Sequence, residues 1–186
     1  MTAKRRALFL DRDGVINIDH GYVYQQDQFE FVGGIFDLCR KAVALDYLVI
    51  VVTNQAGIGR GYYTEQQFHE ITAWMCGEFL AQGAKIERVY FCPFHPEHGV
   101  GKYKRESGFR KPGPGMILDA ARDYGLDLAS SVLVGDKESD IAAGLAAGVG
   151  RNILYCPRGP SQISAGALII DDLRDAEKFL AAESGR

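Results

Sequence analysis

The chain has 186 residues, a length that suits one domain with a substantial buried core, and we expect a single domain over residues 1–186. Its 47% hydrophobic and 24% charged residues are typical of a globular protein. A net charge of -3 argues against general nucleic-acid binding, and no apolar run reaches the roughly 20 residues that span a bilayer. The opening MTAKRRALFLDRDG holds too short an apolar run for a secretory signal, and the four cysteines lack paired spacing. We expect a cytoplasmic monomer with reduced thiols and no nucleic-acid or membrane partner.

Short apolar runs alternate with helical patterns along the chain. The predicted elements are, in chain order, strand 7–10, helix 35–45, strand 47–52, helix 65–81, strand 89–91, helix 114–124, strand 131–134, helix 139–147, strands 152–155 and 168–170, and helix 173–182. Thr64 and Gln67 form a capping-box pattern before one helix, and Gly125 and Gly148 stand where two others should end. Residues 95–111 are rich in glycine, proline and charge, which predicts a long loop.

The predicted strands are apolar throughout rather than alternating, which suits parallel strands covered by helices on both faces. The alternation of strand and helix therefore predicts an α/β fold, a doubly wound parallel sheet in a three-layer sandwich with right-handed crossovers. In such sheets ligands bind beyond the carboxyl ends of the strands. The residues that stand at those ends are therefore the candidates for function.

The first predicted strand ends in the motif DRDG, residues 11–14. Asp11 and Asp13 are two residues apart after a buried strand, so both carboxylates can turn toward one point above the sheet. A divalent cation that prefers oxygen ligands, such as Mg2+, would remove their mutual repulsion. Gly14 lets the backbone turn sharply and approach a ligand. A solvated acidic turn is the alternative, because aspartate and glycine are common turn residues.

Neutral donors follow the second predicted strand, in the motif TNQ at residues 53–55 and the glycine-rich turn that begins at Ala56. Hydroxyl, amide and backbone N–H groups suit phosphate oxygens. Lys111 precedes Pro112 and a rigid turn, where a fixed cation can neutralise charge on a transferring phosphoryl group. A flexible loop and a solvated surface lysine are the alternatives for these two segments.

The fourth predicted strand ends in Gly135-Asp136, which places a third carboxylate beside the first pair. Asp140 follows at the start of the next predicted helix, where an acid also suits the helix dipole. Helix capping and support of a metal are equally open for Asp140.

The order of these motifs along the chain carries more weight than any one of them. With Asp-x-Asp-Gly, Thr-Asn, Lys and Gly-Asp in this order, the chain resembles the haloacid dehalogenase (HAD) superfamily of phosphotransferases. More narrowly, DRDGVIN (11–17), TNQAGI (53–58) and RKP (110–112) resemble the D-glycero-D-manno-heptose 1,7-bisphosphate phosphatase group, which includes histidinol-phosphate phosphatases. The resemblance covers residues 8–155.

The resemblance implies a fold without a large cap domain and a reaction through an aspartyl-phosphate intermediate. Asp11 would be the nucleophile, and Asp13 would protonate the leaving oxygen and then deprotonate the attacking water. Mg2+ would be held by the Asp11 side chain, the Asp13 backbone carbonyl and Asp136. Thr53 and Lys111 would bind the phosphoryl oxygens.

The resemblance also implies removal of the 7-phosphate of heptose 1,7-bisphosphate, in the biosynthesis of ADP- or GDP-heptose for lipopolysaccharide. It leaves the anomer open, and histidinol phosphate or another small phosphate ester is the alternative substrate. The positions that match the family's substrate contacts are Asp19, His20, Gly21, Tyr22, Thr53, Asn54, Gln55, Ala56, Arg110, Lys111 and Lys137. The basic segment 102–111 would attract a second phosphate, although a solvated loop is the favoured interpretation of Lys102, Lys104 and Arg105.

One segment departs from the family pattern. Many relatives hold a structural zinc with a Cys-x-His pair and a Cys-x-Cys pair, whereas this chain has Cys92-Pro93-Phe94 and Ser107-Gly108-Phe109. Only Cys92 of the four ligands is present, and structural zinc requires four. We therefore expect Mg2+ as the cofactor and no zinc, with Phe94 and Phe109 packing together in its place.

A receiver-type signalling domain is the non-enzymatic alternative, because it also phosphorylates an aspartate on a parallel sheet. Receivers resemble one another in placing this aspartate after the third strand. No acid directly follows the third predicted strand of this chain, residues 89–91. The sequence therefore favours a hydrolase.

Overall fold

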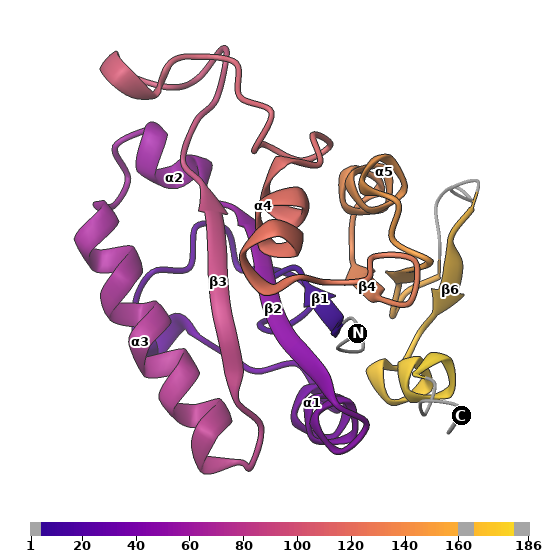
Figure 1. The fold of residues 1–186 in the computed structure, drawn as a ribbon. Helices are drawn as coiled ribbons and strands as arrows, with labels where there is room; N and C mark the ends of the chain where they lie inside the picture. The colour runs from indigo at the N-terminus through magenta and orange to yellow at the C-terminus, as the bar shows by residue number, and fades with distance from the viewer. Residues whose placement is uncertain (1–4, 160–165, 181–186) are drawn as a thin grey trace.

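The computed structural model describes residues 5–159 and 166–180, and its centre is one sheet of six parallel strands (Figure 1). The strands, in chain order, are β1 (Arg6–Leu10), β2 (Tyr47–Asn54), β3 (Ile86–Cys92), β4 (Val132–Gly135), β5 (Arg151–Tyr155) and β6 (Leu168–Ile170). Their order in the sheet is β3-β2-β1-β4-β5-β6. Because β1 pairs with β2 on one side and β4 on the other, the chain winds outward in both directions from β1. The expected doubly wound parallel sheet is confirmed.

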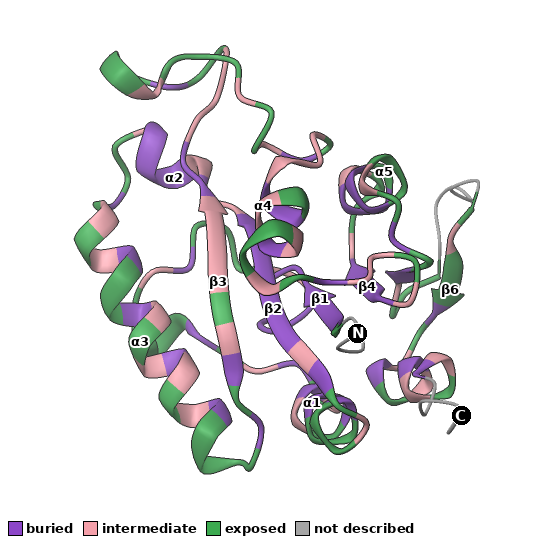
Figure 2. Ribbon diagram, viewed as in Figure 1, coloured by how far each residue is buried: buried purple, intermediate pink, exposed green. Residues whose placement is uncertain are grey.

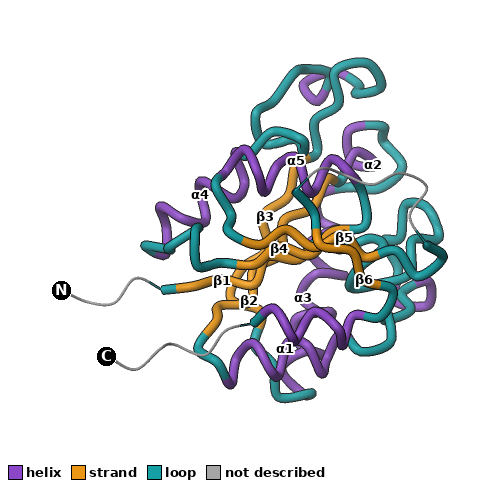
Figure 3. Tube along the Cα trace, turned by 90° about the vertical axis from the view of Figure 1, so that its right-hand side faces the viewer, coloured by secondary structure: helices purple, strands orange, loops and turns teal. Residues whose placement is uncertain are grey.

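Helices cover both faces of the sheet and make it the middle of three layers (Figure 3). Helices α1 (Ile35–Ala44) and α3 (Glu65–Ala81) and the 3-10 helix η3 (Leu173–Phe179) pack on one face, and α4 (Gly115–Tyr124) and α5 (Glu138–Ala147) pack on the other. The connections contain the short helix α2 (Ala56–Gly59) and the 3-10 turns η1 (Gln26–Gln28) and η2 (Gly101–Tyr103). Over the described residues, no helix has both the length and the apolar character of a membrane span.

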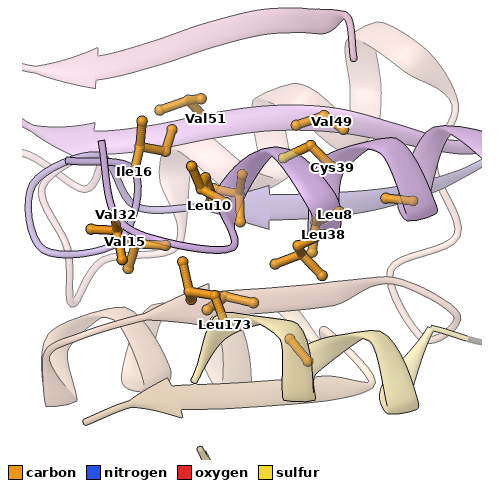
Figure 4. Close-up of a cluster of buried hydrophobic side chains, with 14 of the residues drawn as sticks. Leu8, Leu10, Val15, Ile16, Val32, Leu38, Cys39, Val49, Val51 and Leu173 are labelled. Carbon is orange, nitrogen blue, oxygen red and sulfur yellow. The ribbon is translucent and has the colours of Figure 1, made fainter. Parts of the chain in front are cut away.

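The central strands fill two hydrophobic cores at once. Leu8 and Leu10 of β1 lie in the core beneath α1 and α3, whereas Phe9 between them lies in the core beneath α4 and α5. Figure 4 shows the first core, where Val49 and Val51 of β2 lie close to β1. These side chains are almost completely buried (Figure 2), and each such burial stabilises the fold by about 1.5–3 kcal/mol. The sheet is therefore a rigid support for residues at the carboxyl ends of its strands.

The predicted helix signals are present in the structure. Thr64 Oγ1 accepts a hydrogen bond from Gln67 N at 3.1 Å, and Thr64 N donates to Gln67 Oε1 at 2.9 Å, which completes the capping box of α3. Helices α4 and α5 end at Gly125 (φ 63°) and Gly148 (φ 84°), in the left-handed conformation that favours glycine. These local signals fix where the helices begin and end.

Two predicted strands are longer by more than one residue in the structure. β2 continues through Thr53 and Asn54, because both residues still pair with β3. β3 begins at Ile86 and includes Cys92, although its charged residues hid this length from the hydrophobic pattern. Thr53 and Asn54 are therefore held by the sheet rather than by a loop.

Two other predicted segments have a different conformation. Residues 56–59, expected as a glycine-rich turn, form helix α2, in which Gly57, Ile58 and Gly59 are buried. The last predicted helix, 173–182, is a 3-10 helix that ends at Phe179, and residues 181–182 lie outside the described part of the chain. Residues 95–111 form the expected long loop, interrupted by η2.

Candidate active site

Residues that are far apart in the sequence meet at the carboxyl end of the sheet, where β1 and β4 lie side by side and the winding direction changes. Ligands bind at this point in open α/β sheets. A cavity of about 680 Å³ lies here, and Asp11, directly after β1, is part of its wall. The other predicted site residues that line it are Asp13, Asp19, Gly21, Tyr22, Asn54, Gln55, Ala56, Arg110, Lys111 and Lys137.

The Asp11 carboxylate is buried and paired with the ammonium group of Lys111. Lys111 Nζ donates to Asp11 Oδ1 at 2.7 Å and to the Val52 carbonyl at 2.8 Å, and its distance to Asp140 Oδ1 is 2.7 Å. Burial raises the pKa of Asp11, and the charge of Lys111 opposes that rise. Burial would lower the pKa of Lys111, but the two carboxylates outweigh it and raise the pKa. A charged ammonium group is therefore fixed beside the carboxylate.

Asp11, Asp136 and Asp140 offer carboxylate oxygens that lie within 4.8 Å of one another. Asp136 Oδ1 is buried without a hydrogen-bond partner among the residues that the structure describes. Gly14 (φ 99°) makes room for this carboxylate, because a Cβ atom there would lie 2.1 Å from Asp136 Oδ2. Burial and the charge of Asp11 raise the pKa of Asp136 to about 8. Crowded carboxylates with a free oxygen fit a divalent cation that prefers oxygen ligands.

Asp140, whose role the sequence leaves open, uses both of its oxygens within the protein. Oδ2 accepts the backbone N–H groups of Asp136 and Lys137 at 3.2 and 3.0 Å, at the start of α5. Oδ1 forms the ion pair with Lys111. Asp140 therefore caps the helix and holds the lysine beside Asp11.

The Asp13 carboxylate is held from two sides. Oδ1 accepts from Arg12 Nη2 at 2.7 Å, from Arg12 Nε at 3.2 Å and from Asn17 Nδ2 at 3.1 Å. Oδ2 accepts from Gln55 Nε2 at 3.0 Å. Arg12 is almost completely buried, and its guanidinium also donates to the Val23 carbonyl at 2.6 Å. The orientation of Asp13 is therefore fixed before any substrate binds.

Two of the predicted substrate residues are not part of the cavity wall. The His20 side chain is 51% exposed and lies 3.3 Å from Glu30. Thr53 is buried, and its Oγ1 accepts a hydrogen bond from Gln55 Nε2 at 2.9 Å. Lys137, which does line the cavity, lies 3.3 Å from Asp19 Oδ2, so the loops after β1 and β4 are joined there.

The cavity also has lining residues that the sequence did not indicate, chiefly Arg60, Tyr63, His95 and Ser139. Arg60 lies within the predicted glycine-rich turn at residues 56–61 and Tyr63 follows it, so counting the whole turn and a few residues beyond it would have included both. His95 stands in the long loop, where no periodic pattern indicates its direction. Lys102, Lys104 and Arg105 do not line the cavity, consistent with the interpretation of a solvated loop.

The loop that carries the family's zinc ligands is held here by other contacts. Burial raises the pKa of the Cys92 thiol, and interactions with the Phe94 backbone and the Ser107 side chain oppose that rise. The centre of the Phe94 ring lies 3.8 Å from the Arg105 guanidinium, while Phe109 is 39% exposed. Among the described residues, the Phe94 ring contacts Arg105 and Tyr103 (centroids 6.2 Å apart), and no ring contact joins it to Phe109.

Known proteins are similar to this chain in sequence and in fold. The HAD-hydrolase-like family matches residues 108–155. The D-glycero-alpha-D-manno-heptose-1,7-bisphosphate 7-phosphatase of Burkholderia mallei is 59% identical over 95% of this chain and 94% of that protein. The D-glycero-beta-D-manno-heptose-1,7-bisphosphate 7-phosphatase of Vibrio cholerae is 45% identical over 94% of this chain and 95% of that protein.

A solved structure of a heptose bisphosphate phosphatase also has a fold similar to that of this chain. The D,D-heptose 1,7-bisphosphate phosphatase of B. bronchiseptica, complexed with magnesium and phosphate, matches with a TM-score of 0.79. It is 28% identical and covers 94% of this chain and 97% of that one. HAD phosphatases use Mg2+, which agrees with the acidic cluster beside Asp11. The chain therefore belongs to the D-glycero-D-manno-heptose 1,7-bisphosphate 7-phosphatase family of HAD hydrolases.

Proposed function

We propose that this enzyme removes the 7-phosphate of D-glycero-D-manno-heptose 1,7-bisphosphate through an aspartyl-phosphate on Asp11. The observation that carries the proposal is the buried Asp11 carboxylate, 2.7 Å from Lys111 Nζ, in the wall of a cavity at the carboxyl end of β1. A buried carboxylate beside a fixed cation is suited to attack a phosphoryl group. The names of relatives up to 59% identical support the choice of substrate.

In the first step, the Asp11 carboxylate forms a bond to phosphorus, and the bond between phosphorus and the substrate's C7 oxygen breaks. Asp13 gives its proton to that oxygen, so the sugar 1-phosphate leaves with a neutral hydroxyl group at C7. Lys111 neutralises charge on the phosphoryl oxygens as it develops. The Thr53 hydroxyl, which accepts a hydrogen bond from Gln55, would donate to the same phosphoryl oxygens.

In the second step, water attacks the phosphorus of the aspartyl-phosphate. Asp13, now ionised, takes a proton from that water, and the bond from phosphorus to Asp11 breaks. Inorganic phosphate leaves and Asp11 is regenerated as a carboxylate. Asp13 ends the cycle protonated, as it began.

The hydrogen bonds of Asp13 support an assignment of the oxygen that moves the proton. Asp13 Oδ1 accepts three hydrogen bonds, two from Arg12 and one from Asn17, and these bonds occupy its lone pairs. Gln55 supplies the one donor to Oδ2 among the described residues, so a lone pair remains there. Oδ2 is therefore the atom that gives and takes the proton.

A metal ion fits beside these residues. Asp11, Asp136 and the Asp13 backbone carbonyl would hold Mg2+, whereas both oxygens of Asp140 are used by Lys111 and the start of α5. The ion supplies charge neutralisation between an anionic nucleophile and an anionic phosphate. Asp136 Oδ1, buried and without a hydrogen-bond partner in the described part of the chain, supports this assignment.

The cavity also has cations for the second phosphate of the substrate. A sugar bisphosphate carries roughly -3 to -4 charge, from about -1.5 to -2 on each phosphate. Arg60, Arg110 and Lys137 line the cavity, although the chain as a whole has a net charge of -3. These cations would therefore attract the second phosphate of the substrate on an otherwise acidic protein.

Phosphate release from a panel of substrates tests the proposal. The panel contains both anomers of the heptose 1,7-bisphosphate, fructose 1,6-bisphosphate and histidinol phosphate, each with and without Mg2+. We propose the α anomer as the preferred substrate, because the relative named for it is 59% identical and the one named for the β anomer is 45% identical. A higher kcat/KM for the β anomer overturns the anomer assignment, and a marked preference for histidinol phosphate overturns the substrate.

We further propose a cytoplasmic monomer of one domain that binds Mg2+ and no structural zinc. Cys92 is the single cysteine or histidine at the family's four zinc positions, which supports the absence of zinc. Metal analysis of the purified protein tests the zinc proposal, and about one zinc per chain contradicts it. Light scattering coupled to gel filtration tests the oligomeric state.

A further inference from the structure

Gln55 joins two parts of the active site through one buried amide. Gln55 is 1% exposed, and it also lines the cavity. Nε2 donates to Asp13 Oδ2 at 3.0 Å and to Thr53 Oγ1 at 2.9 Å. The same amide group therefore orients the acid/base and the hydroxyl of the phosphate site.

Tyr63 fixes the other end of this amide. Its hydroxyl donates to Gln55 Oε1, and burial raises the pKa of Tyr63, which keeps the hydroxyl a donor. The Tyr63 ring stacks on Tyr24 with a centroid distance of 5.1 Å and an interplanar angle of 10°. It also lies across Gly57, where a Cβ atom would be 2.2 Å from the ring. The ring is thus held by its neighbours.

We propose that Tyr63 is a positioning residue for the reaction, acting through Gln55 on Asp13. A primary amide can rotate to exchange its oxygen and nitrogen, and in the rotated state its oxygen would face the Asp13 carboxylate. In the rotated state the Tyr63 hydroxyl would face the amide nitrogen, and its O–H would lose the acceptor that it has at Gln55 Oε1. The Tyr63 hydroxyl therefore disfavours this rotation. Arg12 and Asn17 hold Oδ1, so Gln55 alone among the described residues sets the direction of Oδ2.

This inference rests on the proposed role of Asp13 as the acid that protonates the leaving oxygen. Loss of the Tyr63 hydroxyl should then matter most where the leaving group needs a proton. A sugar alcohol needs one, whereas p-nitrophenol leaves as a stabilised anion. kcat/KM is the parameter to compare, because it includes the first chemical step and not the later attack of water.

The test is the variant Tyr63→Phe, with Tyr24→Phe as the matched control. Tyr24→Phe removes a hydroxyl from the stacked partner ring and leaves the bond from Tyr63 to Gln55 in place. We expect Tyr63→Phe to lower kcat/KM about tenfold for the heptose bisphosphate and less than about twofold for p-nitrophenyl phosphate. We expect Tyr24→Phe to change neither by more than about twofold. Equal losses on both substrates, or no loss on either, overturn the inference.

A second measurement separates this inference from the proposed substrate. NMR of the Gln55 side-chain amide reports its hydrogen exchange without any substrate. We expect exchange about tenfold faster in Tyr63→Phe than in the wild type or in Tyr24→Phe. The reason is that Gln55 Oε1 no longer accepts the hydrogen bond from the Tyr63 hydroxyl, which restricts the motion of the amide. If the wild type does not hydrolyse the heptose bisphosphate, the proposed substrate is wrong, and an unchanged exchange rate then overturns the positioning role by itself.

Discussion

Lys111 Nζ lies 2.7 Å from Asp140 Oδ1, and both side chains are at least 97% buried. Lys111 comes from the long loop after β3, whereas Asp140 is in the first turn of α5. The same ammonium group donates to Asp11 after β1 and to the Val52 carbonyl in β2. One buried cation thus joins the loop, the sheet and the helix at the proposed catalytic site.

Replacement of Asp140 by Asn should lower both stability and activity. The amide retains an acceptor for the start of α5, but Lys111 loses one of its two carboxylate partners. Breaking a buried ion pair costs about 3–5 kcal/mol, so we expect a loss near the lower end of this range in the free energy of unfolding. Chemical denaturation measures it.

The control for this change is Asp37→Asn, which breaks the exposed ion pair between Asp37 and Arg40. Exposed pairs contribute about 0–1 kcal/mol, so its effect should be several times smaller. Equal losses in the two variants contradict the structural role of Asp140.

Replacement of Lys111 by Met should remove charge stabilisation from the phosphoryl group. We expect kcat to fall by a factor of about 10²–10³, as is common for the loss of one such donor. Steady-state phosphate release measures it, with Lys104→Met as the control because Lys104 is exposed and does not line the cavity. Retention of more than about a tenth of the wild-type kcat would argue against the role of Lys111.

The metal-free enzyme should lose stability as the pH rises. Burial and the charge of Asp11 raise the pKa of Asp136 from 3.8 to about 8, so between these values the folded state binds more protons than the unfolded state. The free energy of unfolding therefore falls across this window and is highest at its acidic end. Mg2+ needs the ionised carboxylate, so it should stabilise more at high pH than at low pH.

Thermal unfolding with EDTA or Mg2+ measures this dependence. At a concentration about 100 times its Kd, the ion adds about 2.7 kcal/mol, which corresponds to a Tm about 5–10 °C higher for a chain of this size. We expect this increase near pH 8 and a smaller one near pH 5. An increase that is larger at the acidic pH contradicts the assignment of Asp136 as a ligand.

The loop after β3 should depend on Arg105 rather than on a metal. The Arg105 guanidinium lies 3.8 Å from the centre of the Phe94 ring, and such contacts contribute about 0.5–1 kcal/mol at exposed sites. We expect Arg105→Ala to speed limited proteolysis of the loop severalfold, whereas Lys104→Ala should not. Equal protection in both variants shows that the contact does not hold the loop.

The fold and the proposed catalytic residues could be predicted from the sequence because their signals are local. Apolar runs that end in Asp11 and Gly135-Asp136 indicate buried strands with an acid at the carboxyl end of each. Parallel strands then bring those ends together without further information. The family resemblance added Thr53 and Lys111 as partners, and Lys111 does meet Asp11 in the structure.

The remaining features depend on contacts between distant segments. Nothing near Asp140 in the sequence indicates that its Oδ1 will form an ion pair with Lys111, which comes from another loop. Tyr63 is indistinguishable from an ordinary core aromatic until its hydroxyl is seen to meet Gln55. His20 shows the opposite case, because its position beside the nucleophile loop suggested a contact, yet it turns toward Glu30.

Phosphate release by Asp11→Asn tests the central claim most directly. The amide is nearly the same size as the carboxylate but is a poor nucleophile, so circular dichroism should show an unchanged fold. We expect release from the heptose bisphosphate to fall by at least about 10³-fold with saturating Mg2+, because covalent catalysis is lost. Turnover within about tenfold of the wild type would show that Asp11 is not the nucleophile.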